Sequence, residues 1–170
     1  TYSWVSAIDM GKETTMFKGN AFPIGANMGF RKSCLDTIGM FNTELGRTKK
    51  NLMGGEEKDI FNRAKAYGMN IYYFPNIEIQ HVIPPTRTTK DYIIRLGEGV
   101  GMSEQLRCKK LGNTVYLKRI FSECIKWCGT IVLWTKYLFQ KGSNAGYMLV
   151  LFRWNVTKGL LKPITTEKAQ

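Results

Sequence analysis

Leu52–Ile60, which reads LMGGEEKDI, places two glycines directly before three acidic residues and the start of a helical pattern. Glycine lets a backbone approach a ligand closely, and carboxylates in the first turn of a helix face its positive end, which favours their ionised form. The stretch therefore suits a general base beside a bound substrate, and it also suits a helix that simply begins with acidic residues. Gly68 predicts the end of this helix. Its buried face is predicted at Ile60, Phe61, Ala64 and Tyr67.

Upstream of this stretch, small and apolar residues at Gly25–Arg31 place a glycine two residues away from Asn27 on either side. Glycines in an extended segment indicate a bulge or a close backbone approach. Asn27 between them could bind a polar ligand or could lie in an ordinary turn. A short helix is predicted from Ser33 to Ile38, with Gly39 as its end.

Downstream, residues 70–74 and the alternating residues 77–81 predict two strands, and the second strand ends at His81, the only histidine. A helix is then predicted to run from Thr88 towards Cys108. Three glycines in that helix, Gly97, Gly99 and Gly101, weaken it unless another segment packs closely against them.

Composition separates a near-neutral body from a basic C-terminal tail. The 170 residues carry a net charge of +12, of which residues 1–106 contribute +2 and residues 107–170 contribute +10. Such a length predicts one domain, or one domain with an appendage. Four scattered cysteines show no paired framework and indicate reduced thiols in the cytosol. A basic tail suits an anionic membrane surface or nucleic acid.

The tail is predicted to form a basic, amphipathic helical hairpin at residues 113–170. Its longest uncharged runs, 127–135 and 142–152, are shorter than the about 20 apolar residues that span a bilayer. The hairpin suits either the membrane interface or packing on the body. Nucleic acid is not an expected partner, because the aromatic residues share the apolar stripe instead of alternating with the charges. The stripe of the first helix is Leu117, Ile120, Phe121, Cys124, Trp127, Cys128, Ile131, Trp134 and Leu138.

The order of these motifs, over roughly residues 20–101, resembles the second half of the catalytic domain in family 2 glycosyltransferases with the GT-A fold. The resemblance implies an α/β protein: residues 1–112 would be the acceptor-side, C-terminal part of a GT-A (Rossmann-like) domain, followed by the helical tail. The family's Asp-x-Asp metal motif is absent here, so the nucleotide-binding half is expected to lie upstream of Thr1. The segments that carry the resemblance are Gly25–Lys32, Ile38–Phe41, Gly54–Asp59, Ile71–Pro75, His81 and Arg95–Gly101.

The resemblance also implies roles for individual residues. Glu57 matches the family's catalytic base, which is usually Asp, and Glu56 matches the acid that holds the acceptor or orients the site. His81 matches a metal ligand for Mn²⁺ or Mg²⁺, and a nitrogen ligand favours Mn²⁺. The residues implied to contact donor or acceptor are Asn27, Gly54, Gly55, Asp59 and Arg87.

The function implied is transfer of a sugar, with inversion, from a nucleotide-sugar donor to a hydroxyl of a glycan or lipid-linked acceptor. Bacterial cell-surface polysaccharide synthesis is the expected setting, in the cytoplasm and peripherally on the inner face of the cell membrane. The alternative is a non-catalytic module that binds a membrane or a partner, in which the acidic residues serve structure alone.

Overall fold

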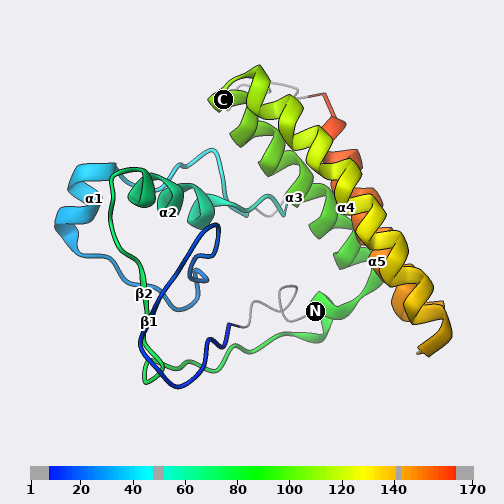
Figure 1. Ribbon diagram of the computed structural model, residues 1–170, viewed down its shortest axis with the longest axis horizontal. Coiled ribbons are helices and arrows are strands. Elements are labelled where there is room, and N and C mark those ends of the chain that lie inside the picture. The colour runs from blue at the N-terminus through cyan, green and yellow to red at the C-terminus, as the bar shows by residue number, and fades with distance from the viewer. Residues whose placement is uncertain (1–7, 48–51, 141–142, 164–170) are drawn as a thin grey trace. The chain divides into compact units, whose positions relative to one another are not determined.

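The computed structural model describes residues 8–47, 52–140 and 143–163 (Figure 1). The chain divides into a first unit, Thr1–Leu45 with Gly55–Pro84, and a second unit, Gly46–Gly54 with Pro85–Gln170. These two units are defined by which residues pack together. The predicted boundary at residue 112 instead separates a catalytic part from a tail, and it stays a prediction.

The predicted α/β, Rossmann-like GT-A fold is wrong, because the described residues are mostly helical. They form two strands of two residues each, β1 (Thr15–Met16) and β2 (Tyr72–Tyr73), which pair antiparallel with Thr15 opposite Tyr73. A Rossmann-like domain needs several parallel strands joined by crossover helices. Two short antiparallel strands do not make such a sheet.

The predicted strand at residues 77–81 is also wrong. This segment has no regular secondary structure, and the side chains of Ile77 and Ile79 are 59% and 51% exposed. Alternation predicts a strand only where a neighbouring strand and a core are present to receive the apolar face. In the first unit the short β1 strand pairs only with Tyr72 and Tyr73, so the alternating isoleucines remain at the surface.

The first unit is built around α1 (Lys32–Ile38) and α2 (Glu56–Ala66). Arg63 on α2 joins the two helices, since its guanidinium donates hydrogen bonds to the carbonyls of Ile38, Gly39 and Met40, where α1 ends. Phe61 stacks on Phe30 with ring centroids 5.1 Å apart. The fully buried residues of this core are Ile38, Ile60, Phe61 and Ala64.

In the second unit three long helices lie side by side, α3 (Lys90–Leu111), α4 (Asn113–Gln140) and α5 (Ser143–Leu161), after the short 3-10 helix η2 (Pro85–Thr88) (Figure 1). Glycines allow α3 and α5 to approach closely. A Cβ on Gly101 would overlap the backbone of Val156 and Gly159, and a Cβ on Gly159 would overlap that of Glu98. The predicted glycine-containing helix is confirmed, and packing explains its glycines.

The side of α4 that faces α3 and α5 carries buried charged residues. Glu123, which is 3% exposed, accepts hydrogen bonds from Arg119 at 2.6 Å and from Arg153 of α5 at 2.9 Å. Arg119 also bonds to Glu104 of α3 at 3.2 Å. These four residues are called here the buried charge network. Two of them, Arg119 and Glu123, lie on the inner side of α4, and the apolar stripe of this helix lies mainly outside. No helix in the described ranges is both long and apolar enough to cross a bilayer.

Candidate functional site

The predicted catalytic carboxylates lie at the start of α2. Gly55 precedes the helix in a left-handed conformation, with φ 98° and ψ 2°, and Glu56, Glu57 and Asp59 occupy the first turn. A side chain at position 55 would strain this backbone, which accounts for the glycine. Because the helix begins directly after Gly55, its unpaired N–H groups and positive end face the same region as the acidic side chains.

Glu57 lies against the turn that contains Gly25. A Cβ on Gly25 would overlap the Oε1 atom of Glu57, so a larger residue there would displace this carboxylate. The turn closes with a hydrogen bond of 2.9 Å from the N–H of Asn27 to the carbonyl of Ile24. The structure therefore brings the predicted base and the predicted ligand-binding turn together, although they are separated by about thirty residues in the chain.

Asn27 is exposed at the end of this turn, and its side-chain amide donates a hydrogen bond of 2.8 Å to the carbonyl of Ile77. That bond uses one of the two amide N–H groups and orients the side chain. The side-chain carbonyl oxygen of Asn27 is a hydrogen-bond acceptor, so it is the atom that suits a ligand hydroxyl.

Asp59 has a structural partner on its own helix. Its carboxylate pairs with Arg63 at 3.0 Å, one turn further along α2, and Arg63 in turn holds the end of α1. Asp59 therefore has a structural role, as an acidic residue in the first turn of α2 that is paired with Arg63. Glu56 is half-buried in the same turn.

Gly54 and Gly55 belong to different units. In the second unit the N–H of Gly54 donates a hydrogen bond of 2.9 Å to Ser103 Oγ, which donates one of 2.8 Å to the carbonyl of Gly99. A Cβ on Gly99 would overlap the backbone of Leu52. Sequence reasoning missed the role of Ser103. The available signal was its position four residues after Gly99, on the same side of the helix.

His81 and Arg87, the predicted metal ligand and diphosphate contact, are both exposed. His81 lies in the first unit within the segment that has no regular structure, and Arg87 lies in η2 of the second unit. The described residues contain no group of three or more His, Cys, Asp or Glu side chains that could hold a metal ion. One histidine alone does not make up the ligand set of a metal site, so His81 does not fit the predicted metal centre.

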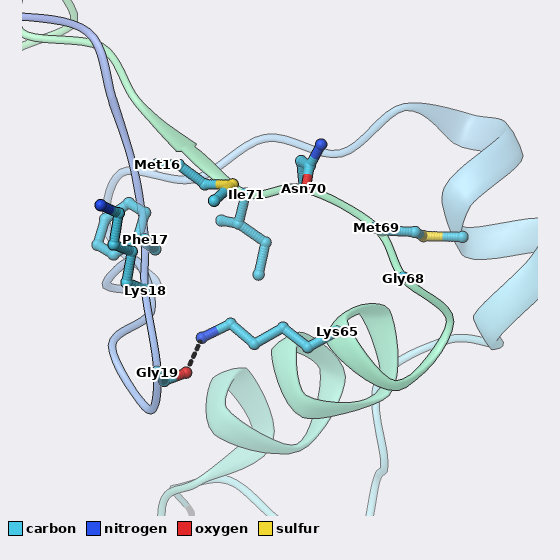
Figure 2. Close-up of a pocket in the computed structure, with 9 residues that line it drawn as sticks. All are labelled: Met16, Phe17, Lys18, Gly19, Lys65, Gly68, Met69, Asn70 and Ile71. Carbon is cyan, nitrogen blue, oxygen red and sulfur yellow. Dashed lines mark hydrogen bonds between the residues drawn. The ribbon is translucent and has the colours of Figure 1, made fainter.

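A pocket of 310 Å³ lies at the opposite end of α2 from the carboxylates. Figure 2 shows it between Lys65, in the last turn of α2, and the segment from Met16 to Gly19. The ammonium group of Lys65 donates a hydrogen bond of 2.7 Å to the carbonyl of Gly19. The ammonium group of Lys65 is used in this bond between α2 and the Gly19 segment, and no carboxylate lines the pocket. This pocket is therefore not the predicted catalytic site.

The second surface with functional character is the outer face of α4. Its apolar side chains are strongly exposed, and two cysteines on the same face, Cys124 and Cys128, are exposed as well. The apolar residues that define this face, with their exposed fractions, are Leu117 (64%), Phe121 (69%), Ile125 (61%), Val132 (65%) and Phe139 (91%).

Comparison with known proteins finds no matching family model, no matching curated protein and no matching solved structure. The glycosyltransferase resemblance therefore depends on its short motifs alone. What the structure adds is the geometry of those motifs, and above all the contact between Glu57 and Gly25.

Proposed function

We propose that this chain takes part in glycosyl transfer, as the part of an enzyme that activates the acceptor hydroxyl, with Glu57 as the general base. The observation that carries the proposal is that the Glu57 carboxylate lies over the backbone of Gly25, beside the turn that ends in Asn27. A base must be held in a defined place next to its substrate, and the Glu57 carboxylate has such a place against the Gly25 turn.

The chemistry is a direct displacement. The acceptor oxygen forms a bond to the anomeric carbon as the bond from that carbon to the diphosphate oxygen breaks. The bonding electrons leave with the nucleoside diphosphate, and the acceptor proton passes to Glu57. In this proposal Glu56 and Asn27, which lie in the same unit as Glu57, orient the acceptor and the donor sugar. The acceptor class is a glycan or lipid-linked sugar, in cell-surface polysaccharide synthesis.

The test is release of nucleoside diphosphate by the whole enzyme, with the nucleotide-binding half that is expected upstream of Thr1, incubated with UDP-, GDP- and dTDP-hexoses and short oligosaccharide acceptors. We expect the wild type to release it, and Glu57→Gln to reduce the rate by about a hundredfold or more, the usual contribution of a general base. Glu78→Gln is the matched control, because Glu78 is an exposed glutamate of the same unit. Equal rates for Glu57→Gln and the wild type, or no release by the wild type, would contradict the proposal.

We also propose that the protein is peripheral on the inner face of the cell membrane, and a non-catalytic membrane module is the second candidate function. The support is the exposed apolar face of α4 in a C-terminal region with a net charge of +10. Sedimentation of the full chain with vesicles of phosphatidylcholine and phosphatidylglycerol tests this association. Binding that a DNA fragment abolishes, together with a gel shift of that DNA, would indicate nucleic acid as the partner instead.

A further inference from the structure

We infer that the outer face of α4 is the surface that enters the interface of an anionic bilayer, with the axis of the helix parallel to the membrane plane. The inference rests on the peripheral association proposed above and names the surface that produces it. Leu117, Phe121, Ile125, Val132 and Phe139 lie on one side of α4 because their spacings are close to multiples of the helical turn. Each of them is more than 60% exposed.

The direction of this face is fixed by the buried charge network. Glu123 is the only acidic residue of α4, and it is held between Arg119 and Arg153 on the side opposite the outer face. Turning the apolar residues inward would break these ion pairs and leave buried charges without partners, which is strongly unfavourable. The apolar residues therefore stay outside in the folded bundle of the second unit.

The outer face extends along the whole helix. With 28 residues α4 is about 42 Å long, so its apolar face is a long and narrow stripe. An exposed apolar stripe of this kind, with cationic residues along its border, is typical of helices that lie in the headgroup region. If this apolar stripe were exposed to water it would be a large apolar patch, and soluble monomers rarely carry such a patch.

Charge favours a bilayer over a second copy of the chain as the occupant. Lys118 and Lys136 are both exposed and lie on the same side of the helix, since about five helical turns separate them. They border the apolar face, and no acidic residue of α4 or α5 is exposed to meet them. A second copy would place lysines against lysines, whereas anionic headgroups neutralise them, and the long lysine stems reach the headgroups from the apolar region.

The experiment measures partition of the full chain onto vesicles of equal parts phosphatidylcholine and phosphatidylglycerol. The variant Val132→Ser/Phe139→Ser removes apolar area from the outer face, and Val82→Ser/Phe74→Ser is its matched control, because both control residues are exposed in the first unit. We expect the first variant to weaken partition by about tenfold or more, equivalent to about 1.4 kcal/mol. The control should bind as the wild type does.

A second pair, Leu117→Ser/Phe121→Ser, repeats the test at the other end of α4, and circular dichroism checks that each variant keeps its helices. Wild-type protein that does not bind the vesicles would contradict the peripheral association itself. Binding by the wild type and by both α4 variants to the same extent would leave that association standing and overturn the outer face as its surface. A dimer by light scattering that dissociates in the α4 variants, with unchanged vesicle binding, would also overturn it and identify a second copy as the occupant.

Discussion

Arg153 of α5 donates a hydrogen bond of 2.9 Å to the carboxylate of Glu123 on α4, a side chain that is almost completely buried. The two residues lie thirty positions apart, and their pairing joins the last two helices. With Arg119 as the second partner of Glu123, this contact sets the rotation of α4 about its own axis. The charged side of the helix is inside as a result, and the apolar side is outside.

The pH dependence of stability follows from this pair. Burial raises the pKa of Glu123, but the hydrogen bonds from Arg119 and Arg153 outweigh burial and hold the pKa below its ordinary value. The pKa of Glu98 is lowered too, first by its hydrogen bond with Lys162. A carboxylate with a lowered folded-state pKa contributes stability that is present above the unfolded pKa, about 4.3 for Glu, and lost as pH falls through the folded pKa.

We therefore expect the free energy of unfolding to fall as pH decreases below about 4.3, measured by urea unfolding in a pH series. Glu123→Gln should make this dependence shallower, because the ionisable group is gone, and should lower stability at neutral pH by about 3 kcal/mol, since two arginines lose their counter-charge. Glu78→Gln is the control at an exposed position. An unchanged pH profile in Glu123→Gln would show that this carboxylate does not contribute to the acid transition.

Two helical glycines of the second unit should respond to alanine in opposite directions. A Cβ on Gly101 would overlap the backbone of α5, whereas a Cβ on Gly129 would meet nothing within 4 Å. We expect Gly101→Ala to destabilise the protein by about 1–3 kcal/mol through overpacking. Gly129→Ala should stabilise it by up to about 1 kcal/mol, because alanine favours the helix more than glycine does. Urea unfolding of both variants checks this, and destabilisation by Gly129→Ala would contradict the exposure of that side of α4.

A similar pair of glycines tests the catalytic proposal without altering a carboxylate. Gly25→Ala would push the Glu57 side chain from its place, whereas a Cβ on Gly29 of the same segment would meet nothing within 4 Å. Because small displacements of a base can reduce catalysis by about a hundredfold, we expect Gly25→Ala to lower the rate of nucleoside diphosphate release by tenfold to a hundredfold. Gly29→Ala should be close to wild type. Equal rates for the two variants would show that the position of Glu57 does not affect the reaction, and would contradict its role as the base.

Local helix signals in the sequence were sufficient for much of the first unit. The helix that follows Gly55 was predicted at its place, and its predicted core residues Ile60, Phe61 and Ala64 are buried. The prediction that Tyr67 is buried was wrong, because Tyr67 lies beyond the end of the helix and is 63% exposed. The sheet could not be predicted correctly, because alternation in residues 77–81 describes one strand and says nothing of whether a neighbour exists to pair with it.

The candidate sites show the same limit. The sequence identified Glu57 and the glycine turn separately, but not their contact, because that contact joins segments far apart in the chain. It identified an apolar stripe on α4 that includes Leu117 and Phe121 of the outer face, but it missed Ile125, Val132 and Phe139 and did not give the direction of that face. Periodicity shows that a helix has an apolar side and a polar side. Which of them is buried depends here on the ion pair between Glu123 and Arg153, which is thirty residues further along the chain.

The native cysteines provide a direct measurement of the outer face of α4 without any substitution. Cys124 and Cys128 are exposed on that face, Cys108 is buried and Cys34 is half-buried in the first unit. A water-soluble maleimide should modify Cys124 and Cys128 readily in solution, with the modified peptides quantified by mass spectrometry. If the outer face enters the bilayer interface, phosphatidylglycerol-containing vesicles should slow the modification of both cysteines by about tenfold or more, because the thiols leave the water in which thiolate and reagent meet.

The rate at Cys34 in the same sample is the internal control and should not change, and pure phosphatidylcholine vesicles should protect Cys124 and Cys128 less, since they lack the anionic headgroups that Lys118 and Lys136 attract. Protection that requires no vesicles and increases with protein concentration would indicate that a second copy covers the face. Full reactivity of both cysteines in protein that has sedimented with the vesicles would place α4 in water and assign membrane contact to another surface of the chain.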